Sequence, residues 1–361
     1  MKKLFMGTMA LAMSAATLVA FAACTPAEND NTGNNGGGNG GGGNAQPDPP
    51  VYTVYAPDGA PALALANAID KSTDGSFEFH IVASNTIAAQ VTGDVPAADF
   101  CVLPVNAAAN LLGTGETYQM LGTVTNGNMY FLTTGDNVEL TTDNLDVLIG
   151  KTVGVVQLNN VPGLTFQTVL KANNLDYQIL SSEVLPSDDM VNLQGIQDAA
   201  TGVTPAGGCD YYLCPEPAAT AKLNGTAASA NPFRLAGSLQ ELYGDGTGYP
   251  QAVLVAKTSV IGHSYGAAMV EDMIGYMEGS AQFLAEADAS DVVARLEDKY
   301  TEGMTPSLNA NNLTSAVIAN CSVRFTPAQE CKERVNAFLA ELIEISPEFT
   351  SAVSDAFYYQ P

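Results

Sequence analysis

The clearest catalytic pattern in the chain is GHSYG at residues 262–266, which fits the G-x-S-x-G nucleophile elbow of serine hydrolases. That chemistry needs a strand that runs into the turn, and an acid and a histidine that follow the serine. The chain has two histidines, His80 and His263, and neither follows Ser264. We therefore exclude the hydrolase and expect Ser264 to be the N-cap of a helix.

Two carboxylates, Asp58 and Glu216, lie in short turns that follow predicted strands. Carboxylates in such turns can pair with a cationic group of a ligand or act as acid and base. Solvated helix caps use the same residue types, so both interpretations stay open. The two isolated histidines, the lack of a cluster of His, Cys and carboxylates, and the lack of a P-loop indicate no metal site and no phosphoryl-transfer site. We expect no cofactor.

Four proline-containing turns share one arrangement, in which a predicted strand ends and a helix begins. They are PDGAP (57–61), LPVN (103–106), LNNVPG (158–163) and CPEP (214–217). In open parallel sheets, ligands bind at the carboxyl edge where such turns lie. Small residues such as Gly59 and Ala60 allow a ligand to approach the backbone closely. One such turn is most often only a connection, but the set of four favours a binding site.

The elements that position these turns alternate between short apolar runs and helical patterns, which predicts an α/β fold with mainly parallel sheets. The predicted strands are 51–56, 77–84, 98–104, 118–124, 128–135, 151–157, 177–181, 209–215 and 251–256. The predicted helices between them are 61–70, 106–112, 164–174, 190–199 and 217–225. After residue 256 we expect helices at 264–287, 290–299, 310–319, 327–345 and 347–358. A capping box of Thr326 and Gln329 is expected to begin the helix at 327–345.

The first 50 residues have the composition of an export signal and a linker. Lys2 and Lys3 precede an apolar stretch that ends at Ala23, which is typical of a secretory signal. Residues 25–50 are rich in Gly and Asn and cannot bury apolar surface, so we expect them to be disordered. The folded part is therefore expected to begin near Val51.

The chain is strongly acidic, with 13 Lys and Arg against 38 Asp and Glu and a formal charge of −25. No basic cluster lies outside the signal, so nucleic acid is not an expected partner. Five cysteines follow Cys24, and the spacing of Cys209 and Cys214 fits no zinc or redox motif. Cys321 and Cys331 could close a small disulfide loop, and buried free thiols are the equal alternative.

Several segments together resemble the substrate-binding lipoproteins of ABC importers, in the branch that binds nitrate, sulfonates, taurine and thiamine precursors. FAAC (21–24) resembles a lipobox, which implies cleavage before Cys24 and a lipid on its sulfur. The other segments are VYAPDGAPALALA (54–66), ADFCVLPVNAAANLL (98–112), YQMLGTVTNGNMYFLTTG (118–135), LDVLIGKTVGVVQLNNVPGLTFQTVLK (145–171) and CDYYLCPEPAATAK (209–222).

The resemblance implies a periplasmic-binding-protein type II clamshell. One lobe would hold residues 51–134 and 246–361, the other would hold 135–245, and the hinges would lie near 133–137 and 245–249. It implies a monomer that is lipid-anchored on the outer face of the cell membrane and that delivers a small molecule to a membrane permease. The turns named above and the segments NGN and QLNN would line the cleft. The expected ligand-binding residues are Asp58, Gly59, Ala60, Asn106, Asn126, Asn128, Gln157, Asn159, Asn160 and Glu216.

The expected ligand follows from a departure from the family pattern, because the candidate turns contain no cationic side chain. Either backbone N–H groups bind an anion alone, or a neutral or cationic ligand uses Asp58 and Glu216. We favour the second interpretation. Two other functions stay open: an enzyme on the same fold, of the pyrimidine-precursor or menaquinone-pathway type, and a surface sensor that is not part of a transporter.

Overall fold

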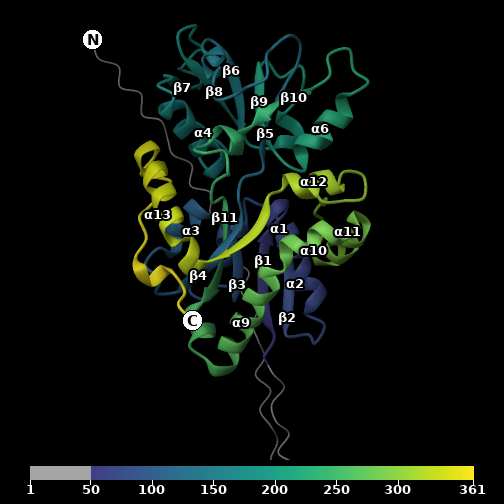
Figure 1. Ribbon diagram of the computed structural model, residues 1–361, viewed down its shortest axis with the longest axis vertical. Coiled ribbons are helices and arrows are strands. Elements are labelled where there is room, and N and C mark those ends of the chain that lie inside the picture. The colour runs from purple at the N-terminus through teal and green to yellow at the C-terminus, as the bar shows by residue number, and fades with distance from the viewer. Residues whose placement is uncertain (1–49) are drawn as a thin grey trace, which may run out of the picture. The chain divides into compact units, whose positions relative to one another are not determined.

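The computed structural model describes residues 50–361 and contains two six-stranded mixed sheets, shown in Figure 1. The first has the order β12 (Val323–Pro327), β4 (Tyr118–Thr125), β11 (Ala252–Lys257), β3 (Phe100–Pro104), β1 (Tyr52–Pro57), β2 (Phe77–Val82). The second has the order β10 (Arg234–Ser238), β5 (Met129–Thr133), β9 (Tyr211–Pro215), β6 (Thr152–Val156), β8 (Val191–Ile196), β7 (Tyr177–Ile179).

Helices flank both sheets, so the predicted α/β class is confirmed. In order along the chain they are α1 (Ala60–Ala64), α2 (Ala66–Lys71), α3 (Val105–Leu112), α4 (Val161–Ala172), α5 (Ala199–Gly202), α6 (Ala218–Thr226), α7 (Leu239–Leu242), α8 (Thr258–Ile261), α9 (Ser264–Glu278), α10 (Ser280–Glu286), α11 (Ala289–Leu296), α12 (Ser315–Asn320) and α13 (Ala328–Ile345). The 3₁₀ turns are η1 (Ile87–Gln90), η2 (Leu145–Leu148), η3 (Glu297–Lys299) and η4 (Asp355–Phe357).

We call the first sheet with its helices lobe 1 (residues 50–125 and 252–361) and the second lobe 2 (residues 129–242). Two segments connect the lobes, a first crossing at 126–128 and a second crossing at 243–251. The expected first hinge near 133–137 lies further along the chain, because β5 pairs with β9 and β10 and so belongs to the second sheet. The second crossing includes the expected residues 245–249.

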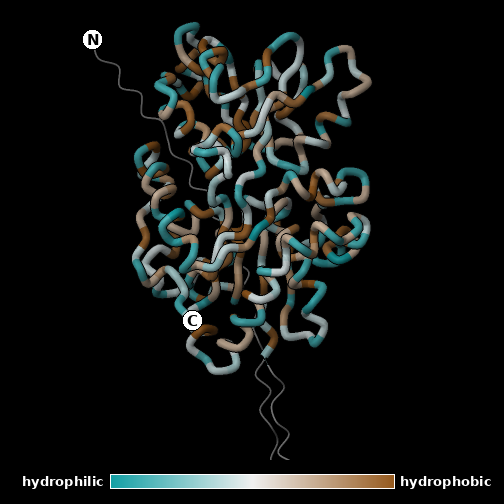
Figure 2. The backbone as a smooth tube through the Cα atoms, in the orientation of Figure 1, coloured by the Kyte–Doolittle hydropathy of each residue, from teal (hydrophilic) through white to brown (hydrophobic). Residues whose placement is uncertain are grey.

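Each sheet is mixed because it contains an antiparallel strand next to a crossing, β11 in lobe 1 and β5 in lobe 2. In lobe 1, β1 runs parallel to β2 and β3, whereas β11 runs antiparallel to β3 and β4. In lobe 2, β6 runs parallel to β8 and β9, whereas β5 runs antiparallel to β9. Figure 2 shows hydrophobic residues along the strands in the middle of each sheet. This pattern agrees with the fully buried strand residues Val54, Val102, Leu213 and Leu254, which form the cores.

Two expected helices are wrong. Residues 190–199 contain β8, whose residues Val191 and Leu193 are fully buried between β6 and β7. Residues 347–358 contain only the short turn η4.

The start of the long C-terminal helix also differs from the expectation. Residues 323–327 form β12, which pairs antiparallel with β4. The expected capping box is absent, since α13 begins after Pro327 without a side-chain cap and the Gln329 amide donates instead to the carbonyl of Tyr359. The expected N-cap of the preceding long helix is wrong as well: α9 begins at Ser264, and its N-cap is His263.

The expected signal, the lipidation site Cys24 and the linker up to residue 49 lie outside the described residues. Within residues 50–361, no helix combines the length and the apolar character that a membrane span requires.

The five cysteines of the described part are all free thiols, so the possible Cys321–Cys331 disulfide is not formed. Cys209 is partly exposed, whereas Cys101, Cys214, Cys321 and Cys331 are buried. Partial burial raises the pKa of the Cys209 thiol, which slows its reaction with electrophiles at neutral pH.

We expect a maleimide to label Cys209 in the native protein and to reach the other four only after unfolding. Peptide mapping by mass spectrometry locates the label, and Cys209→Ser is the control. Native labelling at Cys321 or Cys331 would contradict this arrangement of the core.

Candidate functional site

The two crossings contact each other directly. The backbone N–H of Tyr249 donates to the carbonyl of Asn126 (3.3 Å), and Gly248 packs against that same carbonyl. Asn128 and Gln251 exchange two hydrogen bonds: the Asn128 N–H donates to Oε1 of Gln251 (3.1 Å), and the Gln251 amide donates to Oδ1 of Asn128 (2.7 Å). The crossings are therefore one hydrogen-bonded unit rather than two independent linkers.

Glu216 lies beside this unit, at the carboxyl end of β9. Its backbone N–H donates to the carbonyl of Asn128 (2.9 Å), and the Asn128 amide donates to the carbonyl of Glu216 (3.0 Å). The residue is 3% exposed. Its oxygens accept from the N–H (3.0 Å) and hydroxyl (2.7 Å) of Thr220 and from the amide of Asn320 (3.1 Å). The structure thus brings together three of the predicted residues: Asn126, Asn128 and Glu216.

Asn320, at the end of α12 in lobe 1, makes two bonds to lobe 2. Its amide donates to Glu216, and its carbonyl accepts from the hydroxyl of Tyr130 at 3.2 Å. Burial, with the Glu216 carboxylate as the next cause, raises the pKa of Tyr130, so its hydroxyl stays protonated and able to donate. These bonds hold α12 of lobe 1 against β5 and β9 of lobe 2.

Asp58, the other predicted carboxylate, is bound within lobe 1. Its oxygens accept from the hydroxyl of Tyr300 (2.8 Å), from the N–H (3.0 Å) and hydroxyl (2.8 Å) of Ser307, and from the N–H of Gly59 (2.8 Å). Burial raises the pKa of Tyr300, and the charge and hydrogen bond of Asp58 raise it further. The carboxylate therefore fastens the segment 300–307 to the end of β1.

Gly59 and Ala60 follow at the start of α1 and are both buried. Gly59 has φ +101, and a Cβ added there would have no atom within 4 Å. A buried backbone position beside open space is suited to a ligand, because no side chain of the protein fills that space. The space next to the Gly59 backbone on its Cβ side is therefore not filled by another residue.

Gln157, Asn159 and Asn160 lie between β6 and α4. Gln157 is exposed and has φ 58, and its carbonyl accepts from the N–H of Asn160 (3.0 Å). Asn160 caps α4 by accepting from the N–H of Val161 at 2.8 Å. Because β6 pairs in parallel with β9, continuing the register places Gln157 beside Pro215, next to Glu216. The side chains of Gln157 and Asn159 are exposed, and Oε1 of Gln157 accepts from the Asn160 amide at 3.5 Å.

Asn106 is 4% exposed, and its amide donates to the carbonyl of Phe349 at 3.0 Å. Its Oδ1 is buried without a partner. The amide thus ties α3 to the C-terminal segment, and no hydrogen bond joins its side chain to another predicted site residue.

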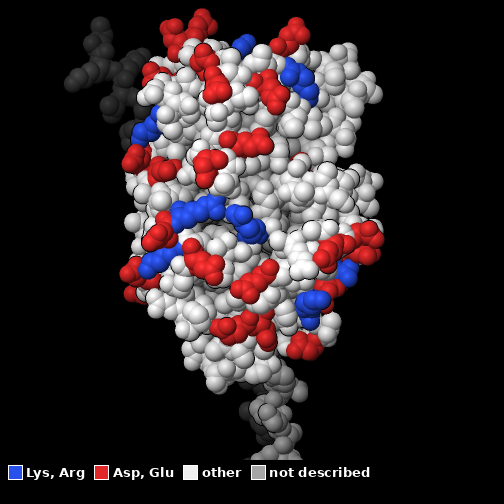
Figure 3. Space-filling model, in the orientation of Figure 1, with Lys and Arg blue, Asp and Glu red and all other residues white. Residues whose placement is uncertain are grey.

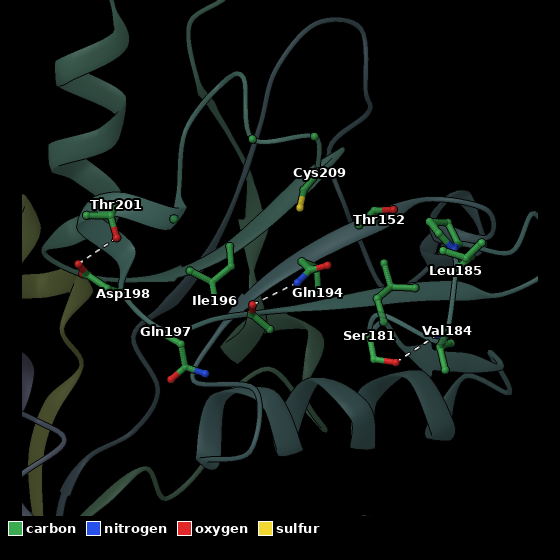
Figure 4. A pocket seen from close by; sticks show the side chains of 16 residues that line it. Thr152, Ser181, Val184, Leu185, Gln194, Ile196, Gln197, Asp198, Thr201 and Cys209 are labelled. Carbon is green, nitrogen blue, oxygen red and sulfur yellow. Dashed lines mark hydrogen bonds between the residues drawn. The ribbon is translucent and has the colours of Figure 1, made fainter. Parts of the chain in front are cut away.

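A cavity lies elsewhere, on one face of the second sheet. It has a volume of about 620 Å³ and lies between the segment 180–186, α5 and the segment 207–209. Figure 4 shows Gln194, Ile196 and Cys209 on its sheet side and Ser181 and Val184 on the opposite side. None of the ten predicted ligand-binding residues lines it, so it is separate from the carboxyl-edge site.

Sequence reasoning did not identify Asn320, Tyr300 or Ser307 as partners of the two carboxylates. It also did not identify Arg324 and Arg334, whose guanidinium groups both contact Asn126. None of these five residues lies in a recognisable short motif. Each contacts its partner in the site across a sequence separation of about a hundred residues or more. Residues 50–361 hold no group of three or more His, Cys, Asp and Glu side chains arranged to bind a metal ion.

No protein-family model and no curated protein sequence matches this chain. Solved structures do match. An ABC transporter protein from Parabacteroides distasonis has a TM-score of 0.65 and 18% identity, covering 86% of this chain and 99% of that one. The periplasmic aliphatic sulphonate binding protein of Escherichia coli has a TM-score of 0.57 and 13% identity, covering 87% and 93%. The alkanesulfonate-binding protein of Xanthomonas axonopodis pv. citri, bound to MOPS, has a TM-score of 0.53 and 15% identity, covering 85% and 97%.

These similarities extend over nearly the whole of each solved chain and confirm the expected fold. The protein has the two-lobed α/β fold of the substrate-binding proteins of ABC import systems. At these identities the likeness concerns the fold and not the ligand.

Proposed function

We propose that this protein is the ligand-capturing component of an ABC importer, anchored to the outer face of the cell membrane through a lipid on Cys24. A small polar molecule binds between the lobes, and the closed protein presents it to a permease. The observation that carries the proposal is the pair of bonds from Asn320 to Glu216 and Tyr130. These bonds join the lobes at the carboxyl edge of the second sheet, where ligands of open α/β sheets bind.

We propose that the ligand contacts the open space beside Gly59 and the side chains of Gln157, Asn159 and Glu216. Glu216 supports a neutral or cationic ligand group, because it is a buried carboxylate whose partners in the described residues are hydroxyl, N–H and amide groups rather than a cation. Asp58 already accepts four hydrogen bonds from its own lobe, so we assign it chiefly to holding that lobe together. The three asparagines 106, 126 and 128 position the backbone.

The test is a thermal-shift screen of amines, vitamin precursors, sulfonates and carboxylates. A ligand at about 100 times its Kd adds about 2.7 kcal/mol to the stability, which raises Tm by roughly 5 °C in a protein of this size. Glu216→Gln is expected to weaken the binding of a cationic ligand about tenfold or more, since about 1.4 kcal/mol separates each tenfold step. Turnover of a screened compound without any shift would favour an enzyme instead.

Asn320→Ala removes the donor to Glu216 and leaves the backbone carbonyl that accepts from Tyr130. We expect this variant to populate the open form more than the wild type, measured as a larger radius of gyration in small-angle X-ray scattering without ligand. Asn312→Ala, in the same part of lobe 1, is the matched control, because the hydrogen bonds of the Asn312 side chain stay within the segment 307–312. Equal radii for Asn320→Ala and wild type would contradict the role of Asn320 in closure.

A further inference from the structure

Two arginines lie side by side at the crossings. Arg324, on β12, donates to Oδ1 of Asn126 at 3.5 Å, and Arg334, on α13, donates to the same oxygen at 3.1 Å. Arg334 also donates to the carbonyls of Gly248 (2.7 Å) and Thr247 (3.5 Å). Figure 3 shows basic side chains adjoining each other in the middle of the visible face, where Figure 1 places β12 and the start of α13.

Neither arginine pairs with a carboxylate among residues 50–361, although this chain has 38 acidic residues against 13 basic ones. Two nearby acidic groups, Asp245 of the second crossing and Glu341 of α13, are engaged with hydroxyl groups. Both the N–H (3.0 Å) and the hydroxyl (2.6 Å) of Thr247 donate to Asp245. The hydroxyl of Tyr243 donates to Glu341 at 2.7 Å.

The donors of the two guanidinium groups are mostly unused by the protein. Each guanidinium carries five N–H donors in a planar fork that matches the oxygens of a carboxylate, sulfonate or phosphate. Arg324 uses one nitrogen and Arg334 uses two, all for neutral oxygens. Two adjacent cations that share one neutral acceptor repel each other, and a bound anion would remove that repulsion.

We propose that Arg324 and Arg334 form a binding site for one small oxyanion, either a free inorganic ion or the anionic group of an organic ligand. The site is built on the crossings, since Asn126 is 5% exposed and belongs to the first, and Gly248 belongs to the second. An oxyanion held by both forks therefore links β12, α13 and both crossings, and favours the arrangement of the lobes described above. The site does not depend on the proposed transport function, because it requires no ligand between the lobes.

The experiment is isothermal titration of the purified protein with sodium sulfate, phosphate, methanesulfonate and acetate, at constant ionic strength maintained with sodium chloride. We expect saturable 1:1 binding of at least one oxyanion, together with a rise in Tm in the same buffer. Arg324→Gln is expected to weaken binding at least tenfold and to abolish the rise in Tm. Tighter binding of sulfate or phosphate would assign a free inorganic ion, and tighter binding of methanesulfonate or acetate would assign an organic anionic group.

Two further variants keep the test independent of folding. Arg334→Lys retains the charge and loses the fork, so it is expected to weaken binding while leaving Tm without oxyanion close to wild type. Arg234→Gln is the matched control: its guanidinium donates to the carbonyl of Gly135 at 3.2 Å and pairs with no carboxylate of the described part, but Arg234 is the first residue of β10 and contacts neither crossing. Absence of saturable binding for all four anions, or unchanged affinity in Arg324→Gln, would overturn the proposal.

Discussion

Replacing Gly248 with alanine is expected to lower the free energy of unfolding by roughly 2–5 kcal/mol, one of the two largest effects we predict for a single substitution. Gly248 has φ +83, a conformation that costs an L-residue about 1–2 kcal/mol. Its added Cβ would lie 2.1 Å from the carbonyl oxygen of Asn126, so the crossings would have to separate. Such overpacking costs about another 1–3 kcal/mol. Thermal and urea unfolding measure the loss.

Gly244→Ala is the matched control, because Gly244 lies in the same crossing and also has a positive φ, +58. A Cβ at Gly244 would have no atom within 4 Å, so only the conformational cost of about 1–2 kcal/mol applies. The difference between the two variants isolates the contact between the crossings. Equal losses for Gly248→Ala and Gly244→Ala would show that this contact does not stabilise the protein.

This contact also limits how the lobes can move. Opening has to break the bonds of Asn320 to lobe 2, whereas the bonds among Asn126, Asn128, Tyr249 and Gln251 lie within the crossings and can persist. Helix α13 adds a second constraint, because Lys171 of α4 pairs with Glu344 at 2.9 Å. We therefore propose that the side of the crossings next to α13 is the pivot and that the side next to α12 opens.

Most strands were predictable from the sequence, because buried strands such as β1, β3 and β11 are continuous apolar runs that end at a turn. The failures have physical causes. In MVNLQGIQDA, Met190, Leu193 and Ile196 recur at helical spacing while Val191 and Leu193 alternate as in a strand, so the pattern is ambiguous. This segment forms the strand β8 because it pairs with β6 and β7. Strand β12 is five residues long and depends on pairing with β4, about two hundred residues earlier, which no local pattern can indicate.

The site could be predicted only for those residues that directly follow the end of a predicted strand. The position of Glu216 at the end of β9 followed from the CPEP turn alone, and the neighbouring asparagines followed from the family resemblance. The partners of these residues could not be predicted: Asp58 and Ser307 are 249 residues apart, and Glu216 and Asn320 are 104 apart. The sequence of a turn does not indicate whether its polar side chain forms hydrogen bonds with a ligand or with other residues of the protein.

Replacing Asp58 with alanine is expected to lower the free energy of unfolding by roughly 3–5 kcal/mol. Four donors on Gly59, Tyr300 and Ser307 would lose their acceptor. Hydrogen bonds to a charged group contribute about 1.5–3 kcal/mol each, but they are not additive when they share one carboxylate. Unfolding by urea measures the loss, and faster hydrogen exchange in residues 300–307 would locate it.

Asp74→Ala is the control for losing a carboxylate that accepts from a serine, because Asp74 accepts from the N–H (3.0 Å) and hydroxyl (2.6 Å) of Ser76 at an exposed loop. Its loss is expected to be much smaller. Asp58→Asn then separates the two roles of Asp58, since it keeps the shape and removes the charge. A lower Tm with unchanged ligand affinity assigns Asp58 to holding the segment 300–307. Weaker binding of a cationic ligand at an unchanged Tm would instead place the carboxylate in contact with that ligand, which its four bonds within lobe 1 argue against.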